Sequence, residues 1–175
     1  MLYASADDVR EQVVSMRVSG GELRTRQVLG QNCSLTIASR SPGYHSEPHV
    51  HDCEQLNYVQ LGEIWVFIGR MAFHLAAGDF LRVPPGAVHW AWNRSQADCE
   101  LIEMHTPGLV LDGIDAPRLV DEGEPVTAPV PSRWESTRYW DYEEAALAAA
   151  QGSQSEAATH DDAEGAIHEP SDTPA

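Results

Sequence analysis

The chain has 175 residues, enough for one domain with a hydrophobic core, and a formal net charge of −16 at pH 7. Because such an acidic chain repels phosphate backbones and anionic lipid surfaces, we expect it to bind neither nucleic acid nor membranes. With no apolar stretch of membrane-spanning length and a polar, acidic N-terminal segment in place of a signal peptide, we expect a cytoplasmic protein.

Residues 1–19 are the first predicted unit, an N-terminal helical segment. Ser5 can cap a short helix that runs to about Val14, because a serine side chain accepts hydrogen bonds from the first free amides of a helix. We expect this segment to flank the main domain.

Residues 20–107 have the pattern of an all-β domain. Short runs rich in Val, Ile, Leu, Thr and aromatic residues alternate with Gly and Pro, and no helical period lies between them. Short strands at this spacing are typical of a β-barrel or sandwich. The sequence shows no internal repeat, so we expect one barrel.

Two further units follow the barrel. Residues 108–150 are rich in Pro and Asp at first and then in aromatic residues, from Trp134 to Tyr142. We expect this extension to pack on the barrel or on a partner subunit and to end in a short helix over 142–150. Residues 151–175 contain six acidic residues, no Lys or Arg and few apolar side chains, so we expect a disordered acidic tail.

Three histidines of the β domain could converge on one metal ion. His49 and His51 are two residues apart, so on a strand both imidazoles project from the same face. His89 follows a Pro-Pro-Gly turn that would present it at the start of another strand. Three imidazoles from two parts of one β domain suit a divalent transition metal.

The spacing around these histidines resembles the two motifs of the cupin superfamily. The first motif has the form G-x5-H-x-H-x3,4-E-x6-G, and its glycines and histidines fall on Gly43, His49, His51 and Gly62. The second has the form G-x5-P-x-G-x2-H-x3-N, and its fixed positions fall on Gly78, Pro84, Gly86, His89 and Asn93. The resemblance implies a single jelly-roll β-barrel with a metal site, a small-molecule substrate and assembly as a homodimer.

One position departs from the first motif, because Gln55 stands where the resemblance implies a glutamate ligand. Glu54 lies one residue early, and a shift of one residue on a strand turns a side chain to the opposite face. We therefore predict His49, His51, Gln55 and His89 as the ligands of one divalent transition metal. The resemblance leaves Fe, Mn, Zn and Ni open.

The glutamine favours one class of chemistry. With four neutral ligands a divalent ion keeps its full charge, which favours Lewis-acid chemistry over redox cycling. The run H-x-H-x2-E-Q is also similar to that of cupins that isomerise unsaturated uronates or a prephenate-derived ketoacid. The expected function is therefore Lewis-acid-assisted isomerisation, tautomerisation or cyclisation of a small molecule with an enolisable carbonyl and a hydroxyl group. The alternatives are a cupin-type dioxygenase and a non-catalytic binding or regulatory cupin.

Further pocket residues follow from strand alternation and from position near the barrel mouth. Asn57 shares the face of Gln55 and could bind substrate, and Arg82 could bind an anionic group of it. Glu103 and His105 share one face of the last strand and would form a carboxylate–imidazole base if they enter the cavity. If Ile102 and Met104 line the cavity instead, the pair lies on the surface, and the sequence leaves both readings open.

Overall fold

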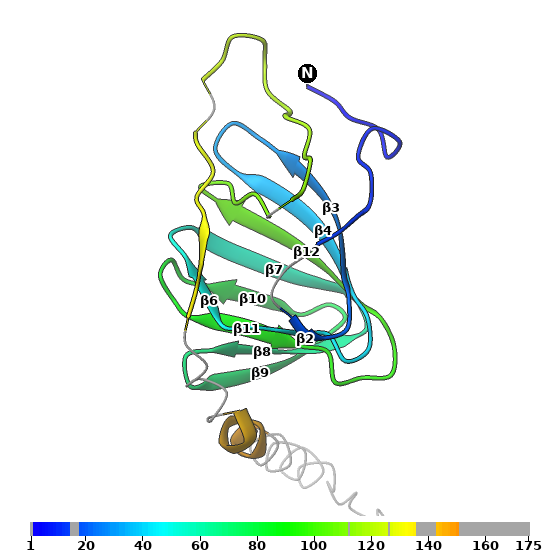
Figure 1. Ribbon diagram of the computed structural model, residues 1–175, viewed down its shortest axis with the longest axis vertical. Coiled ribbons are helices and arrows are strands. Elements are labelled where there is room, and N and C mark those ends of the chain that lie inside the picture. The colour runs from blue at the N-terminus through cyan, green and yellow to red at the C-terminus, as the bar shows by residue number, and fades with distance from the viewer. Residues whose placement is uncertain (1, 15–17, 112, 126, 136–142, 151–175) are drawn as a thin grey trace, which may run out of the picture.

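The computed structural model describes residues 2–14, 18–111, 113–125, 127–135 and 143–150. Its strands form two sheets that curl around a common interior, as expected for a jelly-roll barrel (Figure 1). The first sheet contains, in spatial order, β1 (Gln12–Val13), β3 (Leu23–Leu29), β4 (Ser34–Arg40), β12 (Cys99–Thr106), β7 (Glu54–Leu61) and β10 (Phe80–Val83). The second contains β13 (Ser132–Trp134), β6 (His49–His51), β11 (His89–Trp92), β5 (His45–Ser46) and β2 (Val18–Gly20), with β8 (Glu63–Ile68) beside β11 and β9 (Met71–Ala76) beside β8.

The strands β2 to β12 cover residues 18–106, where the sequence predicted a barrel over 20–107. Turns with glycine separate many of these strands. Gly62 has a φ of 75° between β7 and β8, and a Cβ atom there would lie 2.6 Å from the carbonyl oxygen of Asp98. A side chain at this position would clash with the backbone, so the turn requires glycine.

The interior is divided between apolar and polar side chains. One end of the barrel is filled by a hydrophobic cluster from both sheets: Val59, Ile64, Val66, Ile68, Leu75, Val83, Cys99 and Leu101. The middle of the six-stranded sheet instead turns buried polar side chains inward: Thr25, Gln27, Ser34, Thr36, Arg40, Gln55, Asn57, Glu103 and His105. A polar interior of this kind is suited to binding a ligand, because each buried polar group needs a partner.

The N-terminal helix predicted from Ser5 to about Val14 is not formed in the described residues 2–14. Ser5 does cap a turn, since Asp8 Oδ2 accepts hydrogen bonds from the backbone amide and the hydroxyl group of Ser5, both at 2.8 Å. The chain then becomes extended, and β1 pairs with β3. Val14 is buried against the barrel, which outweighs the weak helix propensity of this segment.

The extension after the barrel packs on it. Strand β13 lies beside β6, and Trp134 contacts His49 with ring centroids 5.4 Å apart. Residues 143–150 are helical, and Leu147 packs against aromatic residues on the outside of β8 and β11. The rest of the predicted aromatic segment (136–142) and the acidic tail (151–175) lie outside the described residues. Within the described part of the chain, no helix has the length and apolarity needed to cross a bilayer.

Candidate metal centre

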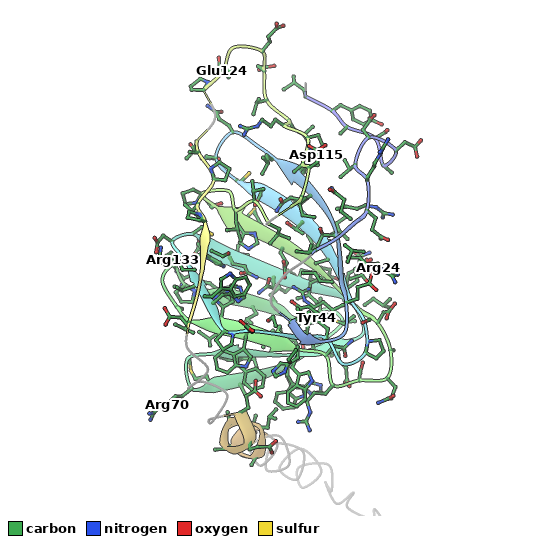
Figure 2. All side chains as sticks on the ribbon, in the orientation of Figure 1. Arg24, Tyr44, Arg70, Asp115, Glu124 and Arg133 are labelled. Atoms are coloured by element: carbon green, nitrogen blue, oxygen red, sulfur yellow. The ribbon has the colours of Figure 1, made fainter. Side chains whose placement is uncertain are left out.

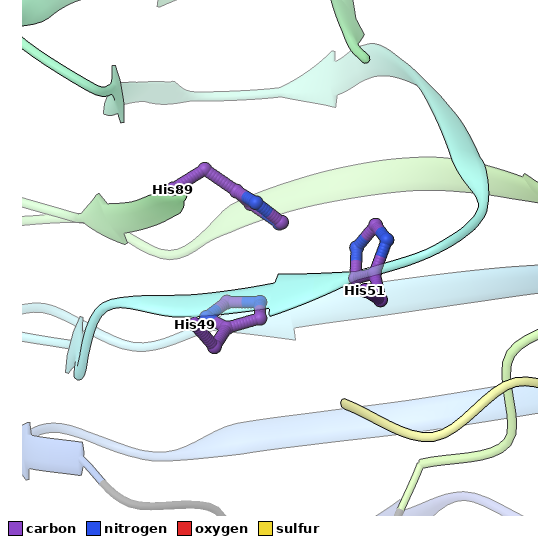
Figure 3. Close-up of side chains that lie close together, drawn as sticks. All are labelled: His49, His51 and His89. Carbon is purple, nitrogen blue, oxygen red and sulfur yellow. The ribbon is translucent and has the colours of Figure 1, made fainter. Parts of the chain in front are cut away.

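Strands β6 and β11 bring the three predicted histidines together. His49 and His51 lie on β6 two residues apart, and His89 begins β11 directly opposite His49 in the antiparallel pair. Their ligand atoms all lie within 4.8 Å of one another, and Figure 3 shows the three rings facing a common point. The i, i+2 spacing and the Pro-Pro-Gly turn thus produce the convergence that the sequence predicted.

A backbone carbonyl orients each of the three imidazoles. The Nδ1 atoms of His49, His51 and His89 lie 3.0, 3.1 and 2.9 Å from the carbonyl oxygens of Glu47, Cys53 and Ala87. A carbonyl oxygen only accepts hydrogen bonds, so each Nδ1 carries the proton and each Nε2 keeps its lone pair. This arrangement is the usual one for metal-ligating histidines.

The Nε2 atoms have the surroundings of metal ligands. Nε2 of His89 is buried and has no hydrogen-bond partner, which is costly in a pocket that holds no cation. Nε2 of His51 lies 3.1 Å from Oε1 of Gln55, whose Nε2 donates to Oδ1 of Asn57 at 2.8 Å. Two acceptor atoms facing each other at this distance fit a shared cation, so the residues present fit a bound metal ion.

Glu54 and Arg82 lie away from this site. Glu54 projects from the outer face of β7, and its Oε1 accepts a hydrogen bond from Arg82 Nε at 2.5 Å. The Arg82 side chain is 57% exposed and does not line the cavity. Strand β10 turns Arg82 to solvent, and its contact with an anionic group of the substrate stays a prediction. Gln55 is buried and faces the histidines, as the register argument predicted.

The orientation of the last barrel strand, which the sequence left open, is settled by the structure. Glu103 and His105 point into the cavity, opposite Asn57 and Gln55 of β7, and Met104 points outward and is 40% exposed. Among the described contacts, no hydrogen bond joins the Glu103 carboxylate to the His105 imidazole, although the sequence led us to expect one. Glu103 instead accepts a hydrogen bond from Arg40 Nη2 at 2.5 Å.

Burial keeps the imidazoles of His49, His89 and His105 uncharged at neutral pH. Burial lowers the pKa of His49 and of His105 to about 4, and it lowers the pKa of His89 well below its usual value. Burial raises the pKa of Glu103, but the charge of Arg40, the charge of His105 and the hydrogen bond from Arg40 together outweigh it, and the pKa lies below its usual value. Neutral imidazole is the form that binds metal ions.

The cavity is small, and residues of the extension form part of its wall. Its volume is about 50 Å³, and besides the residues named above Tyr44, Leu109, Leu111 and Ser132 contribute to its wall. Two hydrogen bonds fix the backbone of Leu109. Its amide N–H donates to Ser34 Oγ at 3.1 Å, and its carbonyl oxygen accepts from Gln27 Nε2 at 2.9 Å.

Sequence reasoning missed Arg40 and Leu109. The alternation of β4, which turns Ser34, Thr36 and Arg40 inward, was the one signal that could have pointed to Arg40. Leu109 follows the last barrel strand in an irregular segment, where no periodicity predicts which side chains face the cavity. Figure 2 shows the rest of this extension passing Asp115, reaching Glu124 at the top of the view and returning toward Arg133, whose guanidinium binds Asp52 at 2.8 Å.

Comparison with known proteins agrees with this architecture. A model of the cupin domain matches residues 37–105, a range that contains all four predicted ligands and ends before Leu109. None of the curated proteins matches the chain.

Solved structures share the fold. A predicted oxalate decarboxylase from Thermotoga maritima is 20% identical with a TM-score of 0.53, covering 60% of this chain and 98% of its own. KdgF from Halomonas sp. is 20% identical with a TM-score of 0.51, and the match covers 60% of this chain and 92% of KdgF. A sugar phosphate isomerase of the cupin superfamily, from Silicibacter pomeroyi, is 18% identical with a TM-score of 0.51. The match covers 59% of this chain and 74% of the isomerase. Identities this low establish a common fold and leave the activity open. With barrel, motifs and family match in agreement, the chain contains a cupin domain, which the family model matches over residues 37–105.

Proposed function

We propose that this cupin is a metal-dependent enzyme that isomerises, tautomerises or cyclises a small molecule with an enolisable carbonyl and a neighbouring hydroxyl group. The observation that carries the proposal is the donor set. Three Nε2 atoms and one amide oxygen, all uncharged, converge in a buried cavity that also holds an ionisable pair and a free imidazole. A divalent ion (Fe, Mn, Zn or Ni) held there would keep its full positive charge and act as a Lewis acid toward a substrate oxygen.

His105 is the proposed proton carrier. Its Nδ1 is buried and has no hydrogen-bond partner, and its ring lies 5.4 Å from that of His51, so it borders the metal centre. A neutral imidazole with the proton on Nε2 can accept a proton at Nδ1 from the carbon beside a carbonyl group and return it to another carbon. The electron pair of the broken C–H bond forms the C=C bond of an enolate while the π pair of the carbonyl moves to its oxygen, and a C=C electron pair of this enolate takes up the proton when it returns.

Glu103 and Arg40 support this transfer. The Glu103 carboxylate lies on the same strand face as His105 and favours the imidazolium that forms when Nδ1 accepts a proton. Arg40 holds Glu103 ionised. Asn57, which positions the amide of Gln55, also lines the cavity and is the proposed contact for a substrate oxygen.

The size of the cavity points to a small substrate. A volume of about 50 Å³ is far below the roughly 300–1,000 Å³ of pockets for drug-sized ligands. We propose a compact keto or hydroxy acid, or a sugar acid of similar size, as the substrate class. The cytoplasmic location and the lack of nucleic-acid and membrane partners stay predictions.

The experiment that tests the proposal is a turnover screen with and without oxygen. Metal-loaded protein is incubated with ketoacids, sugar acids and polyketide-like phenols, and products are followed by NMR. We expect an isomer or cyclised product with the same elemental composition as the substrate and equal rates in both atmospheres. A product formed only with oxygen would identify a dioxygenase instead. Binding of the compounds without turnover would identify a non-catalytic cupin.

Two variants make the screen specific. His105→Gln keeps the metal ligands and should lower the turnover number about 100-fold or more, as expected for loss of a general base. His74→Gln, at a histidine of β9 outside the cavity, serves as the matched control and should keep the activity. Equal activity of the two variants would remove His105 from the mechanism.

A further inference from the structure

Strand β6, which carries two of the three histidines, is short and lies between two partner strands. It has three residues and is placed between β11 and β13 in its sheet. On the β11 side, the register joins His49 to His89, and the amide of Gly86 donates to the carbonyl oxygen of His51 at 2.9 Å. On the β13 side, every residue of β6 is opposite a residue of β13. The pairing of this histidine-bearing strand therefore depends to a large extent on β13.

Each histidine of β6 lies across from one residue of β13. Ser132 is opposite His51 and Trp134 is opposite His49, in the strand that Figure 1 shows in yellow beside β6. Ser132 and Trp134 are two residues apart, so their side chains share one face of the strand. Ser132 lines the cavity, and the Trp134 ring packs on the ring of His49 with their planes at 52°. Two side chains of β13 thus border the two ligands that β6 supplies.

The backbone hydrogen bonds between β6 and β13 lie on both sides of His49. The amide of Glu135 donates to the carbonyl oxygen of Pro48 at 3.0 Å, which makes these two residues a hydrogen-bonded pair. Hydrogen-bonded and non-hydrogen-bonded pairs alternate along an antiparallel ladder, so Arg133 and Val50 form the next hydrogen-bonded pair. His49 and its partner on β13 stand between these two pairs, at a position where side chains approach closely. The ladder therefore fixes the backbone of His49 from both sides.

We propose that β13 is a positioning element of the metal centre, which holds His49 and His51 in binding geometry without supplying a ligand. Ligands that are held in place before an ion arrives bind it more tightly, because less freedom is lost on binding. The cupin model ends at residue 105, so this positioning comes from the extension and not from the matched domain. The inference rests on the function proposed above for the presence of an ion, and it is independent of the reaction.

Two variants of Arg133 in the full chain separate the ladder from the side chain. Arg133→Pro removes the amide N–H that pairs with Val50, and we expect binding of Zn²⁺, Mn²⁺, Fe²⁺ or Ni²⁺ to weaken roughly 10- to 100-fold, as for loss of other groups that orient metal ligands. Arg133→Ala keeps the ladder and removes only the exposed ion pair with Asp52, so the affinity should fall at most about fivefold. Competition titration with a chromophoric chelator measures both affinities.

A proline elsewhere in the extension is the matched control. The amide of Glu124 donates to the carbonyl oxygen of Asp121 at 3.2 Å, and position 122 is the second residue of this turn. Proline is favoured at that position of a turn, so Glu122→Pro should bind the ions as the wild type does.

Variants of Trp134 test the side-chain contact with His49. Trp134→Ala removes the ring and should weaken metal binding roughly tenfold, whereas Trp134→Phe keeps an aromatic ring beside the imidazole and should restore most of the affinity. A merely structural role of Trp134 would lower the thermal stability of the metal-free protein and leave the affinity of the folded chain unchanged. Trp134→Ala also carries the test if circular dichroism shows that Arg133→Pro does not fold.

Hydrogen exchange of the metal-free protein gives a readout that needs no ion. In Arg133→Pro the amides of residues 49–51 should exchange at least about tenfold faster than in the wild type, and those of β8 should exchange at the same rate. Unchanged exchange at residues 49–51 would show that β13 does not order β6.

The outcomes distinguish this inference from the proposed function. Equal metal affinities of the wild type, Arg133→Pro and Trp134→Ala would overturn the inference alone. A wild type that binds a metal ion tightly but turns over none of the screened compounds would count against the proposed function, and the affinities of the variants would still decide the role of β13. A wild type that binds none of the four ions would overturn both.

Discussion

Nε2 of His51 lies 3.1 Å from Oε1 of Gln55, and the surrounding contacts make both atoms acceptors. The imidazole proton is on Nδ1, which donates to the carbonyl oxygen of Cys53, and the amide nitrogen of Gln55 donates to Asn57. Two lone pairs at this separation repel unless a cation lies between them. The contact therefore connects the substitution in the cupin motif with the chemistry that we propose for the site.

Replacing Gln55 with glutamate tests the charge argument. The carboxylate adds a negative charge beside three neutral imidazoles, so Gln55→Glu should raise the affinity for a divalent ion roughly tenfold or more. It should also lower the turnover of an enolisable substrate, because the bound ion is then less positive. Glu54→Gln, one residue away on the outer face, is the control and should leave affinity unchanged in a competition titration. Equal affinities of Gln55→Glu and the wild type would contradict the argument.

The register of β7 was predictable from sequence because strand alternation has a period of two. The motif spacing fixed Gln55 as the inward residue, and Asn57 followed at the next inward position. The inward position of Glu103 was not predictable in this way. Ile102 and Met104 are the apolar residues of that strand, and apolar residues usually face the core, whereas here they cover the outside of the sheet.

Contacts between distant segments were also beyond sequence reasoning. Arg40 and Glu103 meet because β4 pairs with β12, and nothing local in either strand specifies that pairing. The expected hydrogen bond between Glu103 and His105 does not form among the described contacts, because the Glu103 carboxylate pairs with Arg40 instead. At the N-terminus, the helix expected after Ser5 gave way to pairing of β1 with the sheet, a case of tertiary packing overriding local propensity.

The buried ion pair should be important for stability. Glu103→Gln leaves the Arg40 charge buried without its counter-charge, so we expect a loss of about 3–5 kcal/mol in the free energy of unfolding, measured with urea. The double variant Arg40→Met/Glu103→Leu removes both charges and should recover most of that loss. Glu54→Gln breaks the exposed pair with Arg82 and should cost about 1 kcal/mol or less. If Glu103→Gln also lowered the free energy of unfolding by only about 1 kcal/mol or less, that result would contradict the assignment of a buried pair.

Stability of the metal-free protein should fall as the pH is lowered from 7 to 4. The pKa of His105 is about 4 in the folded protein and near 6.5 in an unfolded chain, so between these values the unfolded state takes up a proton that the folded state excludes. The stabilisation is complete above pH 6.5 and is lost as the pH falls through 4. Its size is on the order of 3 kcal/mol for this residue, which is 2% exposed.

Thermal unfolding at pH 7.5, 6.5, 5.5 and 4.5 measures this dependence. His49, whose pKa is also about 4, adds to the slope. The variant His105→Gln should have a flatter dependence on pH than the wild type, because one of the contributing groups is gone. Identical slopes for the two proteins would show that His105 is protonated equally in the folded and unfolded states.

Calorimetric titration of the metal-stripped full chain tests the central claim most directly. The account predicts that Zn²⁺, Mn²⁺, Fe²⁺ or Ni²⁺ binds with a stoichiometry of one ion per chain. Binding should be lost or weakened at least about 100-fold in His89→Ala and unchanged in His74→Ala, at a histidine outside the cavity. A chain that binds none of these ions, or that binds them equally well after His89→Ala, would contradict it.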